Sequence, residues 1–185
     1  MAGAVRSGSP EPRLARADEL AALPGIEQRA GERLRGHEAY PVFAGHGLDQ
    51  DTLRAGLQRR QLWVVEAEGG DLAGYLLGGE LERRFHVLQM DVDPRHARRG
   101  LGRALLRHAL ASAAGQGYGS AVLTTLSDVP WNAAFYASEG FIVVPPARWR
   151  AGMQAVMAEE AALGFPMHLR VVMQRALQGD PGGLL

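Results

Sequence analysis

The part of the sequence best suited to chemistry lies between Pro94 and Gly117, where arginines accumulate without a single Asp or Glu. The 185-residue chain has a net charge of zero, so this segment differs from a balanced background. It also holds Gly100 and Gly102, and backbone N–H groups at a glycine-rich turn before a helix bind anions. The arginines are Arg95, Arg98, Arg99, Arg103 and Arg107.

Basic side chains at the start of a helix oppose the helix dipole, so helix stability does not account for them. A ligand with several phosphates would account for them; a solvated basic surface is the alternative interpretation. The apolar run over residues 85–92 ends at Pro94, which indicates a strand. Apolar residues then recur at helical spacing from Leu101 to Ala113. The segment therefore predicts a strand, a glycine turn and a helix.

Two motifs in this order resemble those of the GCN5-related N-acetyltransferases, the GNAT family. The first, R-R-G-L-G-R-A-L-L after V-D-P, is similar to the family's acetyl-CoA-binding segment. The second, N-A-A-F-Y-A-S-E-G-F from Asn132 to Phe141, resembles its N-x-x-x-Y-x-x-x-G-F block. The resemblance covers residues 12–177. Ala97 departs from the usual Gln or Arg, a small change because the family's pyrophosphate contacts come mainly from backbone N–H groups.

The resemblance implies roles for particular residues, with acetyl-CoA as cosubstrate. Backbone N–H groups from Met90 to Val92 would hold the thioester oxygen, Tyr136 would protonate the leaving sulfur, and Asn132 would contact the pantetheine arm. The alternatives are a core aromatic for Tyr136 and a helix-end residue for Asn132. The implied cofactor-binding residues are Met90, Val92, Arg98, Arg99, Gly100, Leu101, Gly102, Arg103 and Asn132, and no metal is implied.

Acetyl transfer to an amine also needs a group that takes the proton from the amine. An amine with a pKa near 10.4 is mostly protonated at pH 7, and the difference of about 3 units costs about 4 kcal/mol. Family members take this base from varied positions or use a water chain, so the resemblance does not assign it. A core histidine, a helix cap at Asp128 and ion pairs of Asp91 and Asp93 with arginines are competing structural interpretations. The candidates are His86, Asp91, Glu80, Glu82 and Asp128.

The composition is typical of one soluble globular domain, with 46% hydrophobic and 22% charged residues. The absence of cysteine excludes disulfides, a thiolate metal site and a cysteine nucleophile, so any acyl transfer goes directly or through another nucleophile. The first residues lack the apolar core of a signal peptide, and no apolar run approaches ~20 residues. We therefore expect a cytoplasmic protein without a membrane partner, and the balanced charge argues against nucleic acid as a partner.

The order of predicted elements indicates an α/β fold, a central mixed sheet flanked by helices as in GNAT proteins. We expect a single domain over residues 12–177 between disordered tails at 1–11 and 178–185. The helix predicted at 147–163 is an addition to the simplest family members, and its candidate roles are core extension, a dimer contact or a cover for the acceptor pocket. The predicted strands are 13–16, 62–67, 72–81, 85–92, 121–126, 141–144 and 169–177. The predicted helices are 18–34 with Asp18 as its cap, 49–60, one after Gly102, one from Asp128 to Gly140, and 147–163. Residues 36–48 are predicted as a loop.

The leading hypothesis is an acetyl-CoA-dependent N-acetyltransferase that transfers the acetyl group directly to a primary amine, of a small molecule in preference to a protein. Its alternative is a module that binds acetyl-CoA or CoA without turnover, supported by the unassigned base and by Ala97. A nicotinamide-dinucleotide fold is disfavoured because Leu105 stands where its third glycine would fall. The second motif looks like that of bacterial members, and the family makes a homodimer a further expectation. Residues considered for the acceptor side are Tyr40, Thr124, Thr125 and Trp131.

Overall fold

A computed structural model describes residues 11–177, and residues 1–10 and 178–185 of the predicted tails lie outside the described part. Its centre is a seven-stranded sheet in the order β1-β2-β3-β4-β5-β7-β6. Neighbouring strands are antiparallel except β4 and β5, which are parallel. The predicted α/β fold with a mixed central sheet is therefore confirmed. The strands are β1 (Arg13–Leu14), β2 (Leu62–Glu66), β3 (Leu72–Leu81), β4 (Arg84–Val92), β5 (Ser120–Leu126), β6 (Ile142–Val144) and β7 (Arg170–Ala176).

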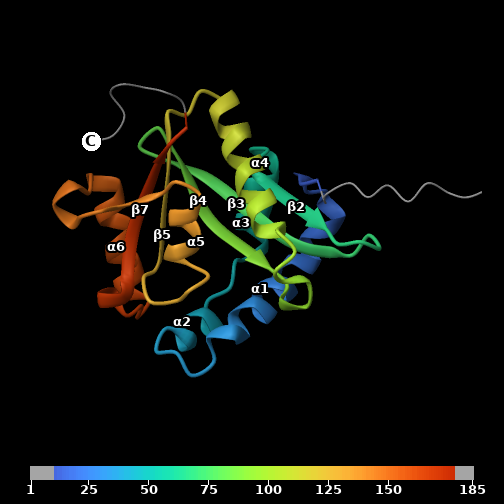
Figure 1. The fold of residues 1–185 in the computed structure, drawn as a ribbon, viewed down its shortest axis with the longest axis horizontal. Helices are drawn as coiled ribbons and strands as arrows, with labels where there is room; N and C mark the ends of the chain where they lie inside the picture. Colours follow the sequence, from blue (N-terminus) through green and yellow to red (C-terminus); the bar gives the residue numbers. More distant parts are fainter. Residues whose placement is uncertain (1–10, 178–185) are drawn as a thin grey trace, which may run out of the picture.

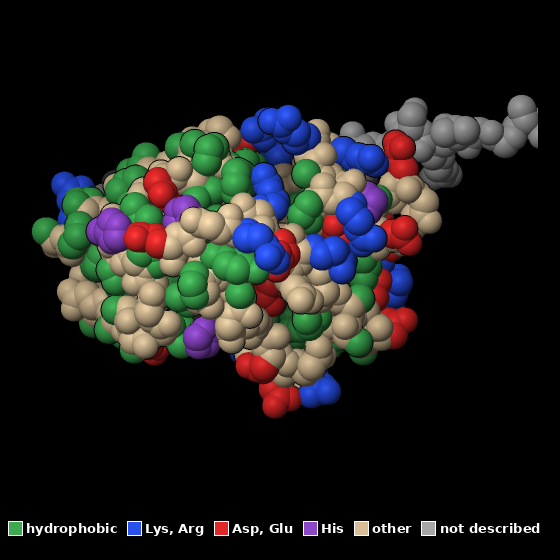
Figure 2. Space-filling model, turned by 90° about the horizontal axis from the view of Figure 1, so that it is seen from below, with side chains coloured by type: hydrophobic (Ala, Val, Ile, Leu, Met, Phe, Trp, Pro, Cys, Tyr) green, Lys and Arg blue, Asp and Glu red, His purple; other side chains and the backbone are tan. Residues whose placement is uncertain are grey.

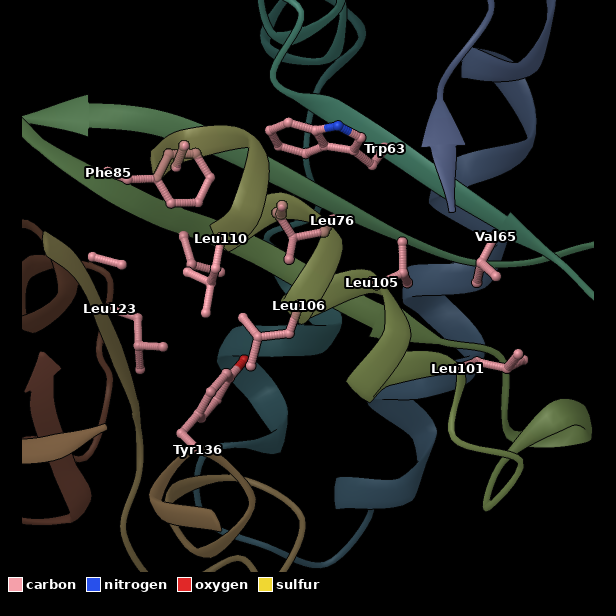
Figure 3. Close-up of a cluster of buried hydrophobic side chains, with 14 of the residues drawn as sticks. Trp63, Val65, Leu76, Phe85, Leu101, Leu105, Leu106, Leu110, Leu123 and Tyr136 are labelled. Atoms are coloured by element: carbon pink, nitrogen blue, oxygen red, sulfur yellow. The ribbon is translucent and has the colours of Figure 1, made fainter. Parts of the chain in front are cut away.

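Helices cover both faces of the sheet (Figure 1). Helix α4 buries its apolar stripe, including Leu105 and Leu106, on one face, in the cluster drawn in Figure 3. Helices α1 and α3 bury Ile26 and Leu53 on the other face. The helices are α1 (Leu23–Gly31), α2 (Tyr40–Gly45), α3 (Gln50–Gln58), α4 (Leu101–Gly115), α5 (Ala133–Ser138) and α6 (Ala151–Ala162), with 3-10 segments at Ala17–Ala22, Glu32–Leu34, Pro94–His96, Pro146–Arg148 and Met167–Leu169.

Strand alternation determines which side chains reach which face. In β3, Leu76 belongs to the α4 cluster, while its neighbours Tyr75 and Leu77 belong to the α1 cluster. The same alternation in β4 sends Met90 and Val92 toward α4. Asp91, between them, therefore points to the α1 side, opposite Tyr75 in the ladder.

The sheet opens between β4 and β5. These strands pair only at Phe85 with Ala121 and His86 with Val122. β4 continues to Val92 beside β3, while β5 continues to Leu126 beside β7. Beyond these two pairs, β4 and β5 are not paired with each other, and we call this interruption of the sheet toward the carboxyl ends of both strands the gap.

The first helix differs from the prediction. In place of one helix over 18–34 capped by Asp18, a 3-10 segment begins after Arg16, and α1 begins at Leu23 with Pro24 in its first turn. Proline is tolerated there because first-turn N–H groups have no helical partner. Glu19 makes the capping contact, since its Oε2 accepts a hydrogen bond of 2.7 Å from Arg16 N.

Two other local predictions were wrong. The predicted loop 36–48 contains helix α2, which buries Val42. Asp128 does not cap the following helix, because its carboxylate contacts His37 Nε2 at 3.0 Å and α5 begins after Asn132. By contrast, Asp49 caps α3 by accepting a hydrogen bond of 2.7 Å from Thr52 N.

The added helix, α6, covers the half of the sheet formed by β5 and β7. Met153 and Met157 pack with Val122 and Val172 in a separate core cluster. Of its predicted roles, core extension is therefore confirmed. None of the helices within residues 11–177 has the length and hydrophobicity needed to cross a membrane.

Candidate active site

Two backbone N–H groups of β4 face the gap. Asp93 N donates to Ala73 O at 2.8 Å, so Asp93 and Ala73 form a hydrogen-bonded pair. Bonded and non-bonded pairs alternate in an antiparallel ladder. Met90 and Val92 are therefore in non-bonded pairs with β3, and their N–H and C=O groups point away from β3 into the space that β5 has left.

The glycine turn at the end of β4 has the backbone expected of an anion site. Gly100 is left-handed, with φ +78°, and Arg98 is also left-handed, with φ +63°. The first helical bond of α4 runs from Ala104 N to Gly100 O, so the N–H groups of the preceding residues have no partner inside the helix. A Cβ at Gly102 would lie 3.5 Å from Val92 Cγ2, which shows how closely α4 begins against β4.

The arginines of this segment fall into two groups. Arg103 and Arg107 both form ion pairs of 2.7 Å with Glu139, which is buried, and Arg95 forms one of 2.7 Å with Asp93. Arg98 and Arg99 form no ion pair within residues 11–177 and are exposed. Although the segment itself contains no acidic residue, the fold thus brings carboxylates to three of its arginines, Arg103 among them. Among the five arginines of this segment, only Arg98 and Arg99 lack an ion pair within residues 11–177.

Tyr136 projects from α5 into the core between the sheet halves, with its hydroxyl directed toward Leu106 (Figure 3). Its ring contacts Phe135 and Phe141 at centroid distances of 5.2 and 5.7 Å. Within the described residues the hydroxyl has no hydrogen-bond partner. Desolvation raises the pKa of Tyr136 above its usual value, and the negative charge of Asp91 raises it further. Tyr136 is therefore both core aromatic and a protonated donor at neutral pH.

Asn132 immediately precedes α5, in the segment that connects β5 to this helix. Its side chain does not cap the helix, although its C=O accepts a hydrogen bond of 3.1 Å from Tyr136 N. Asn132 is thus a helix-end residue through its backbone, and its side-chain amide is not used for capping.

Asp91 forms a polar cluster on the α1 side of the gap. Its Oδ2 accepts hydrogen bonds from Tyr75 Oη at 3.2 Å and Gln89 Nε2 at 2.6 Å. The expected ion pair with arginine is present for Asp93, with Arg29 at 2.8 Å, but not for Asp91, which has no cationic partner within residues 11–177. Burial raises the pKa of Asp91 to about 6. Desolvation also raises the pKa of Glu27 on α1, and the charge of Asp91 adds to that rise.

The other candidate bases lie elsewhere or are occupied. Glu80 accepts a hydrogen bond of 3.0 Å from Tyr118, and Glu82 accepts one of 2.7 Å from Gly152 N. Both lie near the β3–β4 hairpin, at the opposite end of β4 from the glycine turn. Asp128 is paired with His37, which lowers the pKa of Asp128. His86 is buried beside the last β4–β5 pairing, and desolvation lowers its pKa to about 4.

Contacts between distant segments surround Thr124, one of the residues considered for the acceptor side. Phe43 of α2 meets Phe165, which follows α6, at a centroid distance of 5.2 Å. Arg170 at the start of β7 pairs with Glu160 of α6 at 2.6 Å and donates to Thr124 at 2.8 Å. Thr124 is therefore occupied by this buried network, which joins α6 to the edge of the gap.

Comparison with known proteins agrees with this geometry. Residues 58–143 match the family model described as "Acetyltransferase (GNAT) domain". The fold is similar to the ribosomal-protein-S18-alanine N-acetyltransferase from Escherichia coli, at 18% identity and a TM-score of 0.63, over 94% of this chain and 97% of that chain. It is similar to the PaiA N-acetyltransferase from Thermoplasma acidophilum in complex with coenzyme A, at 15% identity and a TM-score of 0.67, over 91% and 99%.

A third similar structure is N-acetylglutamate synthase from Neisseria gonorrhoeae in complex with coenzyme A and N-acetyl-glutamate. The identity is 14%, the TM-score is 0.70, and the match covers 94% of this chain and 36% of that chain. The fold and the family match define the class as an acetyl-CoA-dependent N-acetyltransferase. The GNAT resemblance predicted from the sequence is thus confirmed over residues 58–143.

Proposed function

We propose that this acetyltransferase transfers the acetyl group directly from acetyl-CoA to a primary amine of a small molecule, with Tyr136 as acid and Asp91 as base. The observation that carries the proposal is the gap between β4 and β5. Tyr136 borders it from the α4 side and Asp91 from the α1 side, so donor and acceptor can meet between them.

The cosubstrate lies along the gap in this proposal. The free N–H groups of Met90 and Val92 hold the pantetheine arm and the thioester oxygen, and such preorganised donors stabilise a developing oxyanion. Asn132 contacts the arm from the start of α5. The turn of Gly100, Leu101 and Gly102 holds the pyrophosphate through its N–H groups. Arg98 and Arg99 supply positive charge, and Arg103 contributes through its place beside the turn while paired with Glu139.

The reaction joins the amine nitrogen to the carbonyl carbon and breaks the bond from that carbon to sulfur. The nitrogen becomes more acidic as it forms the new bond, and Asp91 accepts its proton. The electron pair of the broken bond leaves on sulfur, and Tyr136 donates a proton there to give free CoA. Solvent then removes the proton from Asp91 and returns one to Tyr136, so atoms and charge balance.

The two proton transfers assist each other. The charge of Asp91 is one cause of the raised pKa of Tyr136, after desolvation. When Asp91 accepts a proton, that charge disappears and the pKa of Tyr136 falls toward its usual value. Proton uptake on the amine side therefore makes donation on the sulfur side easier.

A small acceptor is supported by contacts between the segment around α2 and the segment after α6. The contact of Phe43 with Phe165 and the contact of Glu38 Oε1 with His168 Nε2, at 2.8 Å, join the segment around α2 to the segment after α6. A folded protein surface would have to displace these contacts, whereas a small amine would not. The third predicted role of the added helix, a part in covering the acceptor pocket, is supported by these contacts of the segment that follows it.

A panel of amines tests the proposal. The purified protein is mixed with acetyl-CoA and each amine, and released thiol and the mass of the acetylated product are measured. Equal amounts of thiol and acetylated amine support direct transfer. Acetyl-CoA binding without product across mono-, di- and polyamines, amino acids and N-terminal peptides would instead support the non-catalytic module.

Replacing Arg98 and Arg99 together by Ala is expected to weaken acetyl-CoA binding by about tenfold or more, because each guanidinium offers charge-assisted hydrogen bonds to phosphate. The measurement is calorimetric titration. The matched control replaces Arg59 and Arg60, an exposed pair after α3 in which Arg60 is left-handed like Arg98. Equal affinities of the two double variants would contradict the placement of the phosphates.

A further inference from the structure

We propose that Arg33 is a phosphate-binding residue for acetyl-CoA, supplied from the α1 side of the sheet and held in position by Trp131. The inference rests on the proposed function, because it concerns the same cosubstrate. It adds a contact that neither sequence motif contains, from a segment far from both in the sequence.

Ion pairs place Arg33 beside the loop between β4 and the glycine turn. Arg29 of α1 donates to Asp93 Oδ2 at 2.8 Å, and Asp93 also holds Arg95, so α1 is anchored to this loop. Arg33 follows one turn later, in the 3-10 segment Glu32–Leu34, and side chains four residues apart lie on the same side of a helix. Desolvation lowers the pKa of Arg33, and repulsion from Arg98 lowers it further, so the two cations lie near each other.

These cations have no acidic partner. Glu32, next to Arg33, pairs with Arg35 and accepts a hydrogen bond from Tyr40. Within residues 11–177, Arg33, Arg98 and Arg99 form no ion pair. Unpaired arginines also occur elsewhere, but here residues from two distant segments converge on one place. Figure 2 shows several Arg side chains, with acidic side chains among them, on the face seen from below, which carries α1, α2 and the loops at the carboxyl ends of β4 and β5. An anion between such cations removes their repulsion.

Trp131 gives Arg33 a defined orientation. Arg33 Cζ lies 4.0 Å from the centroid of the indole ring, within the range of cation–π contacts. A guanidinium stacked on an aromatic ring keeps its in-plane N–H groups free for phosphate oxygens. Trp131 immediately precedes Asn132 and is 41% exposed. We therefore assign Trp131 to the cosubstrate side of the gap, whereas the sequence suggested the acceptor side for this residue.

Calorimetric titration of the full chain with CoA, dephospho-CoA and pantetheine tests this role. Arg33→Ala is expected to weaken CoA binding about tenfold and to leave pantetheine binding within about twofold, because pantetheine has no phosphate. A loss with CoA and dephospho-CoA alike places Arg33 at the pyrophosphate; a loss with CoA alone places it at the 3′-phosphate. The matched control is Arg148→Ala, an exposed arginine without an ion pair in another 3-10 segment, and its CoA affinity should stay within about twofold.

Two results would overturn the inference: equal CoA affinity of Arg33→Ala and Arg148→Ala, or an equal loss of CoA and pantetheine binding in Arg33→Ala. Trp131→Ala should weaken CoA in the same direction, and combining it with Arg33→Ala should add little, since both act through one guanidinium. If the unmodified chain fails to bind CoA, the proposed function itself fails. Failure of Arg33→Ala alone removes only this contact.

Discussion

Tyr136→Phe is expected to lower the rate of acetyl transfer about a hundredfold, because a positioned general acid contributes at least about that factor. The substitution removes one oxygen that has no hydrogen-bond partner among residues 11–177 and keeps the ring contacts with Phe135 and Phe141. Folding and acetyl-CoA affinity should therefore change little. The measurement is steady-state thiol release, with calorimetric binding of acetyl-CoA on the same preparation.

Tyr118→Phe is the matched control. It removes a tyrosine hydroxyl that donates to Glu80 at 3.0 Å, away from the gap, and should keep the parent rate. A Tyr136→Phe variant as active as Tyr118→Phe would leave Tyr136 as a core aromatic and remove its role as acid.

Asp91→Asn is expected to lower the rate by a factor of about a hundred to a thousand, because the amide cannot accept the proton of the amine. The parent enzyme should gain activity as pH rises through about 6, where Asp91 loses its proton. Glu27, Tyr75 and Tyr136 interact with this carboxylate from α1, β3 and α5. The variant should lose the acidic limb of the pH–rate profile along with most of the rate.

Glu27→Gln separates the two carboxylates. Burial, and not Glu27, raises the pKa of Asp91, whereas the charge of Asp91 helps to raise the pKa of Glu27. The variant should therefore keep the acidic limb near pH 6 and most of the maximal rate. Unchanged activity in Asp91→Asn, with a normal acidic limb, would remove Asp91 from the reaction and leave His86 or a water chain as the base.

Stability should change in the opposite direction to activity in Asp91→Asn. The folded-state pKa of Asp91 is about 6, above the value near 3.9 of an unfolded chain, so the folded state binds the proton more tightly. The free energy of unfolding therefore falls as pH rises from about 4 to about 6 and stays lower above that. The variant should be more stable than the parent by about 3 kcal/mol at pH 8, and the two should converge near pH 4. Thermal unfolding at both pH values measures this.

Local patterns predicted the parts of the site that are local in the sequence. The glycine turn could be predicted because Gly100 and Gly102 sit between a strand pattern and a helix pattern, and the structure gives them the backbone of such a turn. Tyr136 could be selected by its motif. Its role as acid stays a prediction, as do the contacts of the cofactor-binding residues, the homodimer and the cytoplasmic location.

The rest of the site depends on contacts that no local pattern contains. Asp91 meets Tyr75 through the β3–β4 register, and Glu27 reaches it from α1. Glu139 pairs with Arg103 and Arg107 only after α5 packs beside α4. Helix α2 was missed because a helix of six residues is unstable alone and depends on tertiary contacts such as those of Val42. For the pairing of Glu139 with these arginines, the only indication in the sequence was the position of Glu139 beside Gly140 in the second motif.

The narrow pairing of β4 with β5 also affects how the molecule holds together. Two residue pairs join a half-sheet of β1 to β4 with a half-sheet of β5, β7 and β6, and packing of residues such as Leu123 and Phe85 in the shared core completes the seam. A molecule that binds to β4 on one side and to α5 on the other bridges the two half-sheets and stabilises their association. Its binding free energy then adds directly to the free energy that resists separation of the halves. A ligand that binds more tightly across the gap should therefore also make separation of the two half-sheets less favourable.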